Sequence, residues 1–343
     1  MAGTVIITGG NGSLGLGFVE AILASHAEYT LIATVRNTSC EEDANTAKLA
    51  KLASKHPNAR VMIERLDLSS LASVRSFADS ISTKISQGEI PTISALVCNA
   101  FTWSLDGGQK MTSDGYEATF QVSHLSHMLL VLKLLGSMDA PSGRIVMLGS
   151  DAHDPDKENP MSKLRAGFPV NDMEQLVHPL PDEPGQVHDR GFQRYANAKL
   201  ANAVFMQDLN ARLLADPSLA GITVTCMDPG GLVDSRAHAE QRALARRVIN
   251  IANAMMPLLR HLTSVMRTTT SAGRDLVALS VGVQFKGKRG HFLGRQEGTP
   301  AKVICDLTVQ KKLWAACWEW VALVQGETVL EKATPVQVNE GDV

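Results

Sequence analysis

Short apolar runs alternate with helix-length amphipathic stretches from the N-terminus to about residue 230, and this alternation limits the possible folds most. Several of the runs are apolar without polar alternation, as expected of strands buried on both faces. Strands are predicted at residues 4–8, 30–35, 60–66, 93–98, 144–149 and 221–227, and helices at 13–25, 41–55, 70–86, 113–135 and 194–214. This order predicts an α/β fold: a doubly wound parallel sheet with helices on both faces.

Two regions break the alternation. Residues 151–191 are rich in Pro, Asp, Glu and His and show weak periodicity, so we expect a long insertion over the carboxyl edge of the sheet. After Asp228 the chain is predicted to be mostly helical to about residue 281. A short strand near 291–293 and a terminal helix over 307–324 follow, and the polar tail from Gln325 is expected to fray.

Charge and cysteine content exclude several classes of protein. The formal net charge of -2 includes no basic excess, which argues against nucleic-acid binding. The five cysteines include no CxxC pair, so neither a zinc site nor a disulfide framework is expected, and a reduced, cytoplasmic location fits best. No signal peptide and no apolar run long enough to span a membrane is seen; peripheral membrane contact through 248–265 is a weaker alternative.

A glycine-rich turn joins the first predicted strand to the first predicted helix. Backbone N–H groups of such a turn can approach a pyrophosphate, and the helix N-terminus adds partial positive charge. Gly9 would permit the tight turn and Gly15 close packing of the helix on the strand; the alternative is a plain βα turn. The candidate cofactor-binding residues here are Thr8, Gly9, Asn11, Ser13, Leu14 and Gly15.

The end of the second strand bears on the choice of cofactor. NAD-specific proteins of this architecture carry an acid about 20 residues after the glycine turn, where it binds the ribose 2′-hydroxyl. Here Arg36 follows the strand with no acid beside it. A guanidinium suits the 2′-phosphate of NADP(H), so NADP(H) is predicted over NAD(H). A solvated loop arginine is the alternative.

Tyr195 and Lys199 are four residues apart, on one face of a predicted helix. A phenol can deliver a proton to a nascent alkoxide, and a neighbouring ammonium with an oxidised nicotinamide would lower its pKa. Tyr195 is therefore the predicted general acid/base, with Lys199 tuning it and holding the cofactor ribose. Ser150, after the fifth strand, can donate to the substrate oxygen. Separately, each residue would be ordinary surface or turn chemistry.

Together these features resemble the short-chain dehydrogenase/reductase family, a Rossmann-fold family, over about residues 5–232. Thr8, Gly9 and Gly15 match its T-G-x-x-x-G-x-G turn, whereas Ser13 stands at the middle glycine. Tyr195 and Lys199 match its Y-x-x-x-K motif. Ser150 aligns with the second, catalytic serine of a pair whose first member is Gly149 here.

The resemblance implies roles for other residues as well. Asp67 and Leu68 match the adenine-contacting pair, and Asn99 and Ala100 match the middle of N-N-A-G, which Cys98 and Phe101 flank here. Pro229, Gly230 and Gly231 match the turn beside the nicotinamide carboxamide. Ser123 replaces the asparagine that orders a proton-relay water. His124 and His127 resemble metal ligands by spacing, but no carboxylate or cysteine accompanies them, so no metal is expected.

Two stretches, residues 67–75 and 114–120, resemble the branch of retinol dehydrogenases and protochlorophyllide reductases. The insertion before Tyr195 and the missing middle glycine also resemble fungal 3-ketosteroid reductases. Both groups act on large lipophilic substrates. The resemblance implies an NADPH-dependent, reversible reductase of a ketone or aldehyde on a polycyclic or terpenoid-like compound of secondary or lipid metabolism. The alternatives are a 3-ketosteroid reductase and a non-redox role as cyclase, isomerase or cofactor-binding protein.

We expect one domain over residues 1–343. It comprises a dinucleotide-binding half (1–150), an insertion over the active site (151–194), a region with the catalytic helix, substrate-lid helices and C-terminal helix (195–325), and a tail (326–343). An apolar stripe could line the substrate site or equally serve as core or dimer face: Met255, Met256, Leu258, Leu259, Leu262 and Met266. A homodimer through helices 113–135 and 194–214 is expected from the family, unless the insertion and terminal helix block it.

Overall fold

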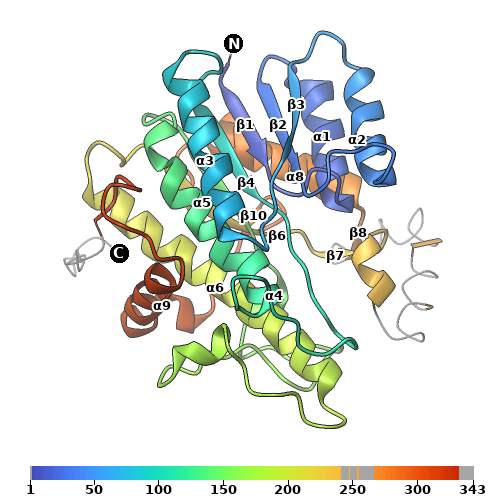
Figure 1. The fold of residues 1–343 in the computed structure, drawn as a ribbon, viewed down its shortest axis with the longest axis vertical. Coiled ribbons are helices and arrows are strands. Elements are labelled where there is room, and N and C mark those ends of the chain that lie inside the picture. Colours follow the sequence, from blue (N-terminus) through green and yellow to red (C-terminus); the bar gives the residue numbers. More distant parts are fainter. Residues whose placement is uncertain (1, 241–246, 248–252, 255–265, 332–343) are drawn as a thin grey trace.

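The computed structural model describes residues 2–240, 247, 253–254 and 266–331, and it confirms the doubly wound α/β fold. The main sheet has the strand order β10-β9-β6-β5-β4-β1-β2-β3, parallel except for β10 (Figure 1). Its strands are β1 (Thr4–Ile7), β2 (Thr30–Val35), β3 (Val61–Arg65), β4 (Ile93–Cys98), β5 (Arg144–Leu148), β6 (Thr223–Asp228), β9 (Gly290–Leu293) and β10 (Gln296–Glu297). All the predicted strands are present. The strand order reverses between β1 and β4, where ligands bind in such sheets.

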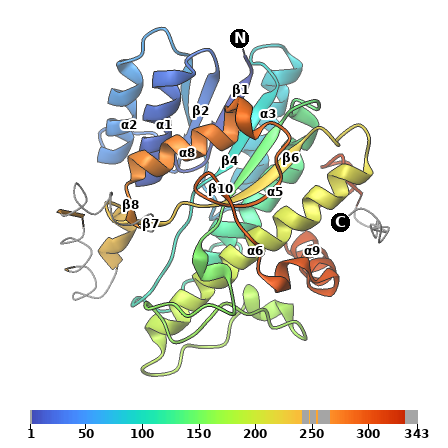
Figure 2. The same cartoon turned by 180° about the vertical axis from the view of Figure 1, so that it is seen from behind.

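Helices cover both faces of the sheet, as Figures 1 and 2 show from opposite sides. One face carries α1 (Ser13–Ser25), α2 (Ala44–Ser54) and α8 (Thr269–Val281). The other carries α3 (Leu71–Ser86), α5 (Ser126–Leu134) and α6 (Val187–Ala215), with α9 (Leu307–Trp320) packed outside α6. Each layer buries its own apolar core against the strands, which explains why the strands are apolar on both faces.

Two helices differ from their predicted bounds. The predicted helix 113–135 begins with α4 (Ala118–Phe120), passes through a π-helical segment (Gln121–Leu125) and continues as α5. The predicted helix 194–214 begins earlier, at Val187, inside the stretch assigned to the insertion. Phe192 is fully buried there, and Gly191 packs against the backbone of Ser104 and Leu105. These long-range contacts are not visible in the local periodicity.

The predicted lid helices are partly wrong. Residues 269–281 form α8, which packs along α1 on one face of the sheet instead of covering its carboxyl edge. Residues 236–240 form a short 3₁₀ helix, and Met266 lies in β8 (Met266–Arg267), which pairs with β7 (Gly231–Leu232). Met266 is 37% exposed. The rest of the predicted apolar stripe lies outside the described residues.

The insertion leaves β5 and packs against α6 and α9. It contains two 3₁₀ turns, Asp151–His153 and Met173–Leu176. Val177 is fully buried, and Glu174 accepts a hydrogen bond from the Trp320 indole of α9. The insertion therefore begins at the carboxyl end of β5 and is fastened to helices beside it.

The expectation that the tail frays from Gln325 is wrong for its first residues. Glu327 pairs with Arg75 of α3 and Lys133 of α5, and Leu330 is buried. These ion pairs and the buried leucine hold the chain against the α3–α5 layer through residue 331. Residues 332–343 lie outside the described part.

Among the described residues, one segment, Ala118–Ser137, is long and apolar enough to cross a membrane. Within it, 83% of the most apolar window is buried inside the protein, as in the core helix of a globular domain. It is therefore weak evidence for a membrane span.

Candidate active site

The turn between β1 and α1 has a backbone built for close approach by a phosphate. Gly9 has φ +65°, and a Cβ at Gly15 would overlap the carbonyl oxygens of Gly9 and Gly10. Both glycines are therefore required, Gly15 for packing against the turn itself. The N-cap of α1 is Gly12, which gives no side-chain cap, so the first-turn N–H groups remain for a ligand.

Other side chains of this turn hold the loop in place. The Asn11 amide donates to Asp43 (2.9 Å) and Thr46 (3.0 Å), which ties the loop to α2. The Thr8 hydroxyl accepts from the backbone N–H groups of Asn99 and Ala100, each at 2.9 Å. Asn99 and Ala100 thus join the end of β4 to the phosphate loop, and Leu14 is buried beneath it.

Arg36, Asp67 and Leu68 follow β2 and β3 at the same edge of the sheet. Arg36 is exposed. The Asp67 carboxylate accepts from the Ser69 N–H (2.9 Å) and hydroxyl (2.6 Å), so it builds the turn ahead of α3. Leu68 is buried, and its carbonyl accepts from Ser126 (2.6 Å).

The turn after β6 lies at the same edge of the sheet, on the other side of β1 from β2 and β3. Gly230 has φ +75°, and its N–H donates to the Asp228 carboxylate at 2.8 Å. Pro229 precedes it, and Gly231 pairs with Met266 in the small β7–β8 sheet. This turn lies at the carboxyl end of β6, next to β5.

Ser150, Tyr195 and Lys199 meet at the carboxyl end of β5. Lys199 of α6 donates to the carbonyl of Leu148, the last residue of β5, at 2.9 Å. Its ammonium lies 5.6 Å from the centroid of the Tyr195 ring. The Ser150 side chain lies near enough to the Tyr195 hydroxyl to act on its pKa. The i, i+4 spacing on α6 and the end of β5 thus bring the three groups together.

Burial controls the charge state of these groups in the protein alone. Burial raises the pKa of Tyr195 above its usual value, although the nearby Ser150 side chain acts the other way. The expected lowering of this pKa by Lys199 is therefore not seen without a cofactor. Burial also lowers the pKa of Lys199 to about 8.

The π-helical segment packs beside α6 and brings the Ser123 carbonyl to Asn202, a residue of α6. The Asn202 amide donates to the carbonyls of Ser123 and Leu148, both at 3.1 Å, and so links Ser123 to the carbonyl that Lys199 contacts. The Ser123 hydroxyl contacts the Thr102 carbonyl at 3.5 Å. π-Bulges occur often at functional sites because they redirect backbone carbonyls.

Both histidines near Ser123 are engaged in internal hydrogen bonds. His124 bonds to Asn202 at 2.9 Å, and His127 bonds to the Thr8 hydroxyl at 2.9 Å. Burial lowers the pKa of His124 to about 4 and that of His127 to about 3, so both are neutral at pH 7. In the described part of the chain, no group of three metal-ligating side chains is found.

An aromatic wall around Tyr195 was missed by sequence reasoning. Phe101, Trp103 and Phe192 have ring centroids 5.8, 5.1 and 5.9 Å from that of Tyr195. Lys199 lies 5.4 Å from the centroid of the Phe101 ring. The sequence marked Phe101 as a departure from the family's glycine, but only the fold shows that its ring lies against Tyr195 and Lys199.

Three polar residues on the Ser150 side of the site were also missed: Asp151, His153 and His291. The Ser150 hydroxyl lies 3.2 Å from the Asp151 carboxylate and can donate to it, and the Ser150 carbonyl is bonded by His153. The His153 ring packs on His291 of β9, with centroids 4.9 Å apart. The sequence signalled Asp151 and His153 only by their closeness to Ser150, and it gave no signal for His291.

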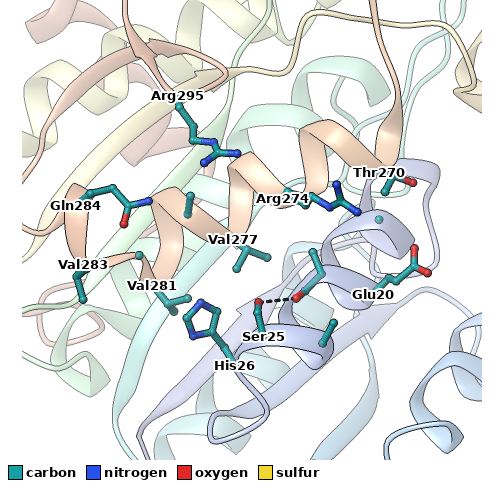
Figure 3. Close-up of a pocket in the computed structure, with 15 residues that line it drawn as sticks. Glu20, Ser25, His26, Thr270, Arg274, Val277, Val281, Val283, Gln284 and Arg295 are labelled. Atoms are coloured by element: carbon teal, nitrogen blue, oxygen red, sulfur yellow. Dashed lines mark hydrogen bonds between the residues drawn. The ribbon is translucent and has the colours of Figure 1, made fainter. Parts of the chain in front are cut away.

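A separate groove of about 600 Å³ lies between α1 and α8 on the outside of the molecule. Figure 3 shows Glu20, Ser25 and His26 on one side, and Arg274 and Val277 on the other. None of the predicted site residues lines it. It is distinct from the edge of the sheet where Ser150, Tyr195 and Lys199 meet.

The sheet is doubly wound, and its first βα turn suits a dinucleotide. A serine, a tyrosine and a lysine lie together at a neighbouring strand end. These features are typical of the class of nucleotide-dependent oxidoreductases. A model of the short chain dehydrogenase family matches residues 3–159, and a model of the AcuH dehydrogenase domain matches residues 232–330. The chain is 32% identical to the short-chain dehydrogenase iccH of Talaromyces variabilis, over 96% of this chain and 98% of that protein. The chain therefore belongs to the short-chain dehydrogenase/reductase family.

Other relatives agree with this assignment. Protochlorophyllide reductase A of Oryza sativa subsp. japonica is 29% identical over 94% of this chain and 81% of its own, which confirms the predicted branch. The NADPH-bound carbonyl reductase from chicken fatty liver shares the fold, with a TM-score of 0.55 and 17% identity over 86% of this chain and 98% of that one. The prediction of a short-chain oxidoreductase is confirmed at the level of family. The AcuH match covers a region in which sequence analysis found no resemblance.

Proposed function

We propose that this protein is an NADP(H)-dependent reductase, and in reverse a dehydrogenase, of a ketone or aldehyde on a lipophilic substrate. The substrate is polycyclic or terpenoid-like and belongs to secondary or lipid metabolism, and the enzyme is cytoplasmic. The convergence of Ser150, Tyr195 and Lys199 at one strand end supports this proposal most strongly. Ser150 follows β5, whereas Tyr195 and Lys199 come from α6. Carbonyl reduction needs such a proton donor, with a hydroxyl and a cation beside it.

Each catalytic side chain has a separate role. When bound, NADP(H) supplies or accepts the hydride. In reduction, the Tyr195 phenol donates its proton to the substrate oxygen, and burial keeps that phenol protonated beforehand because it raises the pKa. The Ser150 hydroxyl donates a hydrogen bond to the same oxygen. The nearby Lys199 ammonium stabilises the phenolate that remains.

The cofactor assignment is supported by the shape and charge of the sheet edge. The uncapped first turn of α1 and the glycines of its loop fit a pyrophosphate, and exposed Arg36 at the end of β2 suits a 2′-phosphate. The chicken carbonyl reductase with the same fold binds NADPH. The family's further contacts are proposed at Asp67, Leu68, Asn99, Ala100, Pro229, Gly230 and Gly231, with Ser123 in the relay.

The aromatic wall supports a large apolar substrate. The Phe101 side chain is 38% exposed, although its ring contacts Tyr195 and Trp103. An exposed ring beside the proton donor offers a flat apolar surface to a planar substrate. A 3-ketosteroid is one member of this class.

The test is NADPH consumption against a panel of lipophilic ketones and aldehydes that includes a 3-ketosteroid, with Tyr195→Phe as the matched variant. Loss of the phenol hydroxyl should lower kcat by at least about a hundredfold, the usual contribution of a general acid. NADPH binding, measured by nucleotide fluorescence, should be retained. Turnover unchanged by Tyr195→Phe would contradict the assignment of the proton donor.

A second candidate function is a non-redox cyclase or isomerase. It is favoured by the Phe101 ring, which lies over Lys199 where the family has a glycine. This candidate predicts tight NADPH binding with no NADPH consumption against any carbonyl in the panel. The same panel therefore separates the two functions.

A further inference from the structure

We propose that Arg236 binds the cofactor pyrophosphate and that Ser13 holds it in place for this task. Arg236 lies in the segment after β7, far from the phosphate loop in sequence, and sequence analysis did not single it out. The inference rests on the proposed function, because it concerns the same nucleotide. It adds a positive charge from a distant segment to a loop that otherwise offers backbone N–H groups.

Three hydrogen bonds place Arg236 against the phosphate loop. Its backbone N–H and its Nε donate to the Ser13 hydroxyl oxygen, at 3.1 and 3.3 Å. Its Nη2 donates to the Asn11 carbonyl at 2.6 Å. Ser13 and Asn11 flank Gly12, the N-cap of α1, so the guanidinium lies where the uncapped N–H groups begin.

The charge of Arg236 is not neutralised by an ion pair in the part of the chain that the structure describes. Its hydrogen-bond acceptors are a hydroxyl and a carbonyl, both neutral. Nearby Asp43 keeps its negative charge and interacts with Arg236 electrostatically, but its hydrogen bonds go to Asn45 and Asn11 and it makes no ion pair with the arginine. A guanidinium has five N–H donors, and the contacts to the loop use two of them, which leaves donors for phosphate oxygens.

This arrangement explains why a serine stands where the family has a glycine. Both lone pairs of the Ser13 hydroxyl accept from Arg236, which leaves its O–H to donate to a phosphate oxygen. Glycine at this position would leave Arg236 only its hydrogen bond to the Asn11 carbonyl. The departure at Ser13 and the position of Arg236 are therefore two parts of one anion-binding device.

The surroundings favour an anion as well. Arg236 and Ser13 border a groove of about 400 Å³ that also includes Lys48 and Lys51 of α2 and Lys55, which follows it. Two acids, Glu20 and Asp234, line the same groove. The Asp234 carboxylate is occupied by the N–H (2.8 Å) and hydroxyl (2.9 Å) of Thr269 at the start of α8. That bond fixes the segment from its other side, so Arg236 is held between α8 and the phosphate loop.

The experiment measures the Kd of NADPH and NADH, by calorimetry and nucleotide fluorescence, for the wild type and for Arg236→Ala. A pyrophosphate contact is common to both nucleotides, so Arg236→Ala should raise both Kd values by the same factor, about tenfold or more. Arg236→Lys keeps the positive charge but loses the paired N–H donors of the guanidinium. Its Kd values should therefore lie between those of the wild type and Arg236→Ala. Arg36→Ala, at the proposed 2′-phosphate site, should raise the Kd of NADPH alone.

Two further variants make the test specific. Ser13→Gly should weaken binding more in the wild type than in the Arg236→Ala background, where only the serine's own contact with phosphate remains to be lost. Arg274→Ala removes an exposed arginine of α8 in the separate α1–α8 groove and should leave both Kd values unchanged. Thermal melts establish that each variant is folded.

The outcomes separate this inference from the proposed function. Equal weakening of NADPH and NADH by Arg236→Ala supports the pyrophosphate contact. Unchanged binding of both, or weakening of NADPH alone, overturns it, the latter because it would place Arg236 at the 2′-phosphate. A wild-type protein that binds neither nucleotide overturns the proposed function itself.

Discussion

At the scale of single residues, Lys199 shows how strongly the pKa of a side chain depends on its burial. The same lysine on an exposed helix would keep its usual pKa, but here it is enclosed by α6, the end of β5 and the Phe101 ring. Burial disfavours the ammonium and lowers its pKa to about 8. The spacing from Tyr195 could be predicted from the sequence, whereas this shift could not, because it depends on what surrounds the amine.

A pH-dependent stability follows for Lys199. Its folded-state pKa lies below the ordinary value, so between about pH 8 and 10.5 the unfolded chain binds more protons than the folded one. Stability from this group therefore rises with pH across that window. Relative to Lys199→Met, the wild type should gain free energy of unfolding, measured with urea, as pH is raised from 7 to 10. A constant difference between the two proteins would show that Lys199 titrates normally.

The contact between α1 and α8 depends on two glycines. A Cβ on Gly273 would overlap the backbone of Gly17 in α1, because the two helices cross with their backbones touching. Neither residue is marked by the periodicity of its own helix. The pairing of these elements explains why α8 lies beside α1 on one face of the sheet and not over its carboxyl edge.

Gly273→Ala tests this crossing. Alanine normally favours a helix by up to about 1 kcal/mol over glycine, but the added methyl forces the helices apart at a cost of about 1–3 kcal/mol. The steric cost is the larger effect, so urea unfolding should show a net loss of stability. Thr270→Ala, at an exposed position of the same helix, should cause none. A Gly273→Ala protein more stable than the wild type would be incompatible with the close crossing.

At the scale of the whole molecule, α9 packs on α6, one of the two helices through which a homodimer is predicted. Trp314 of α9 stacks on Phe205 of α6 at 5.9 Å, and Arg212 of α6 lies 3.8 Å from the Trp314 ring centroid. Trp314 and Trp318 are both buried by this packing. A second copy that docked on this part of α6 would have to displace α9, so the homodimer through residues 113–135 and 194–214 stays a prediction that α9 makes less favourable.

We expect the protein to be a monomer of about 36.9 kDa in solution. Light scattering coupled to size-exclusion chromatography measures this mass directly, at several protein concentrations. A stable species of twice that mass would require either another interface or displacement of α9. Cross-linking between copies of α6 would identify the second case.

The amino-acid sequence by itself determined the alternation of strands and helices, the glycine turn and the pairing of Tyr195 with Lys199. Each of these is a local pattern with residue types at short, fixed spacings. Burial on two faces makes the strands apolar, a φ above zero selects glycine in the turn, and one helical turn separates Tyr195 from Lys199. Only the tertiary structure decided the start of α6, the place of α8, the aromatic wall at Phe101 and the contact of Arg236 with Ser13. The last of these joins residues 223 positions apart, and local periodicity carries no information about which distant segments will meet.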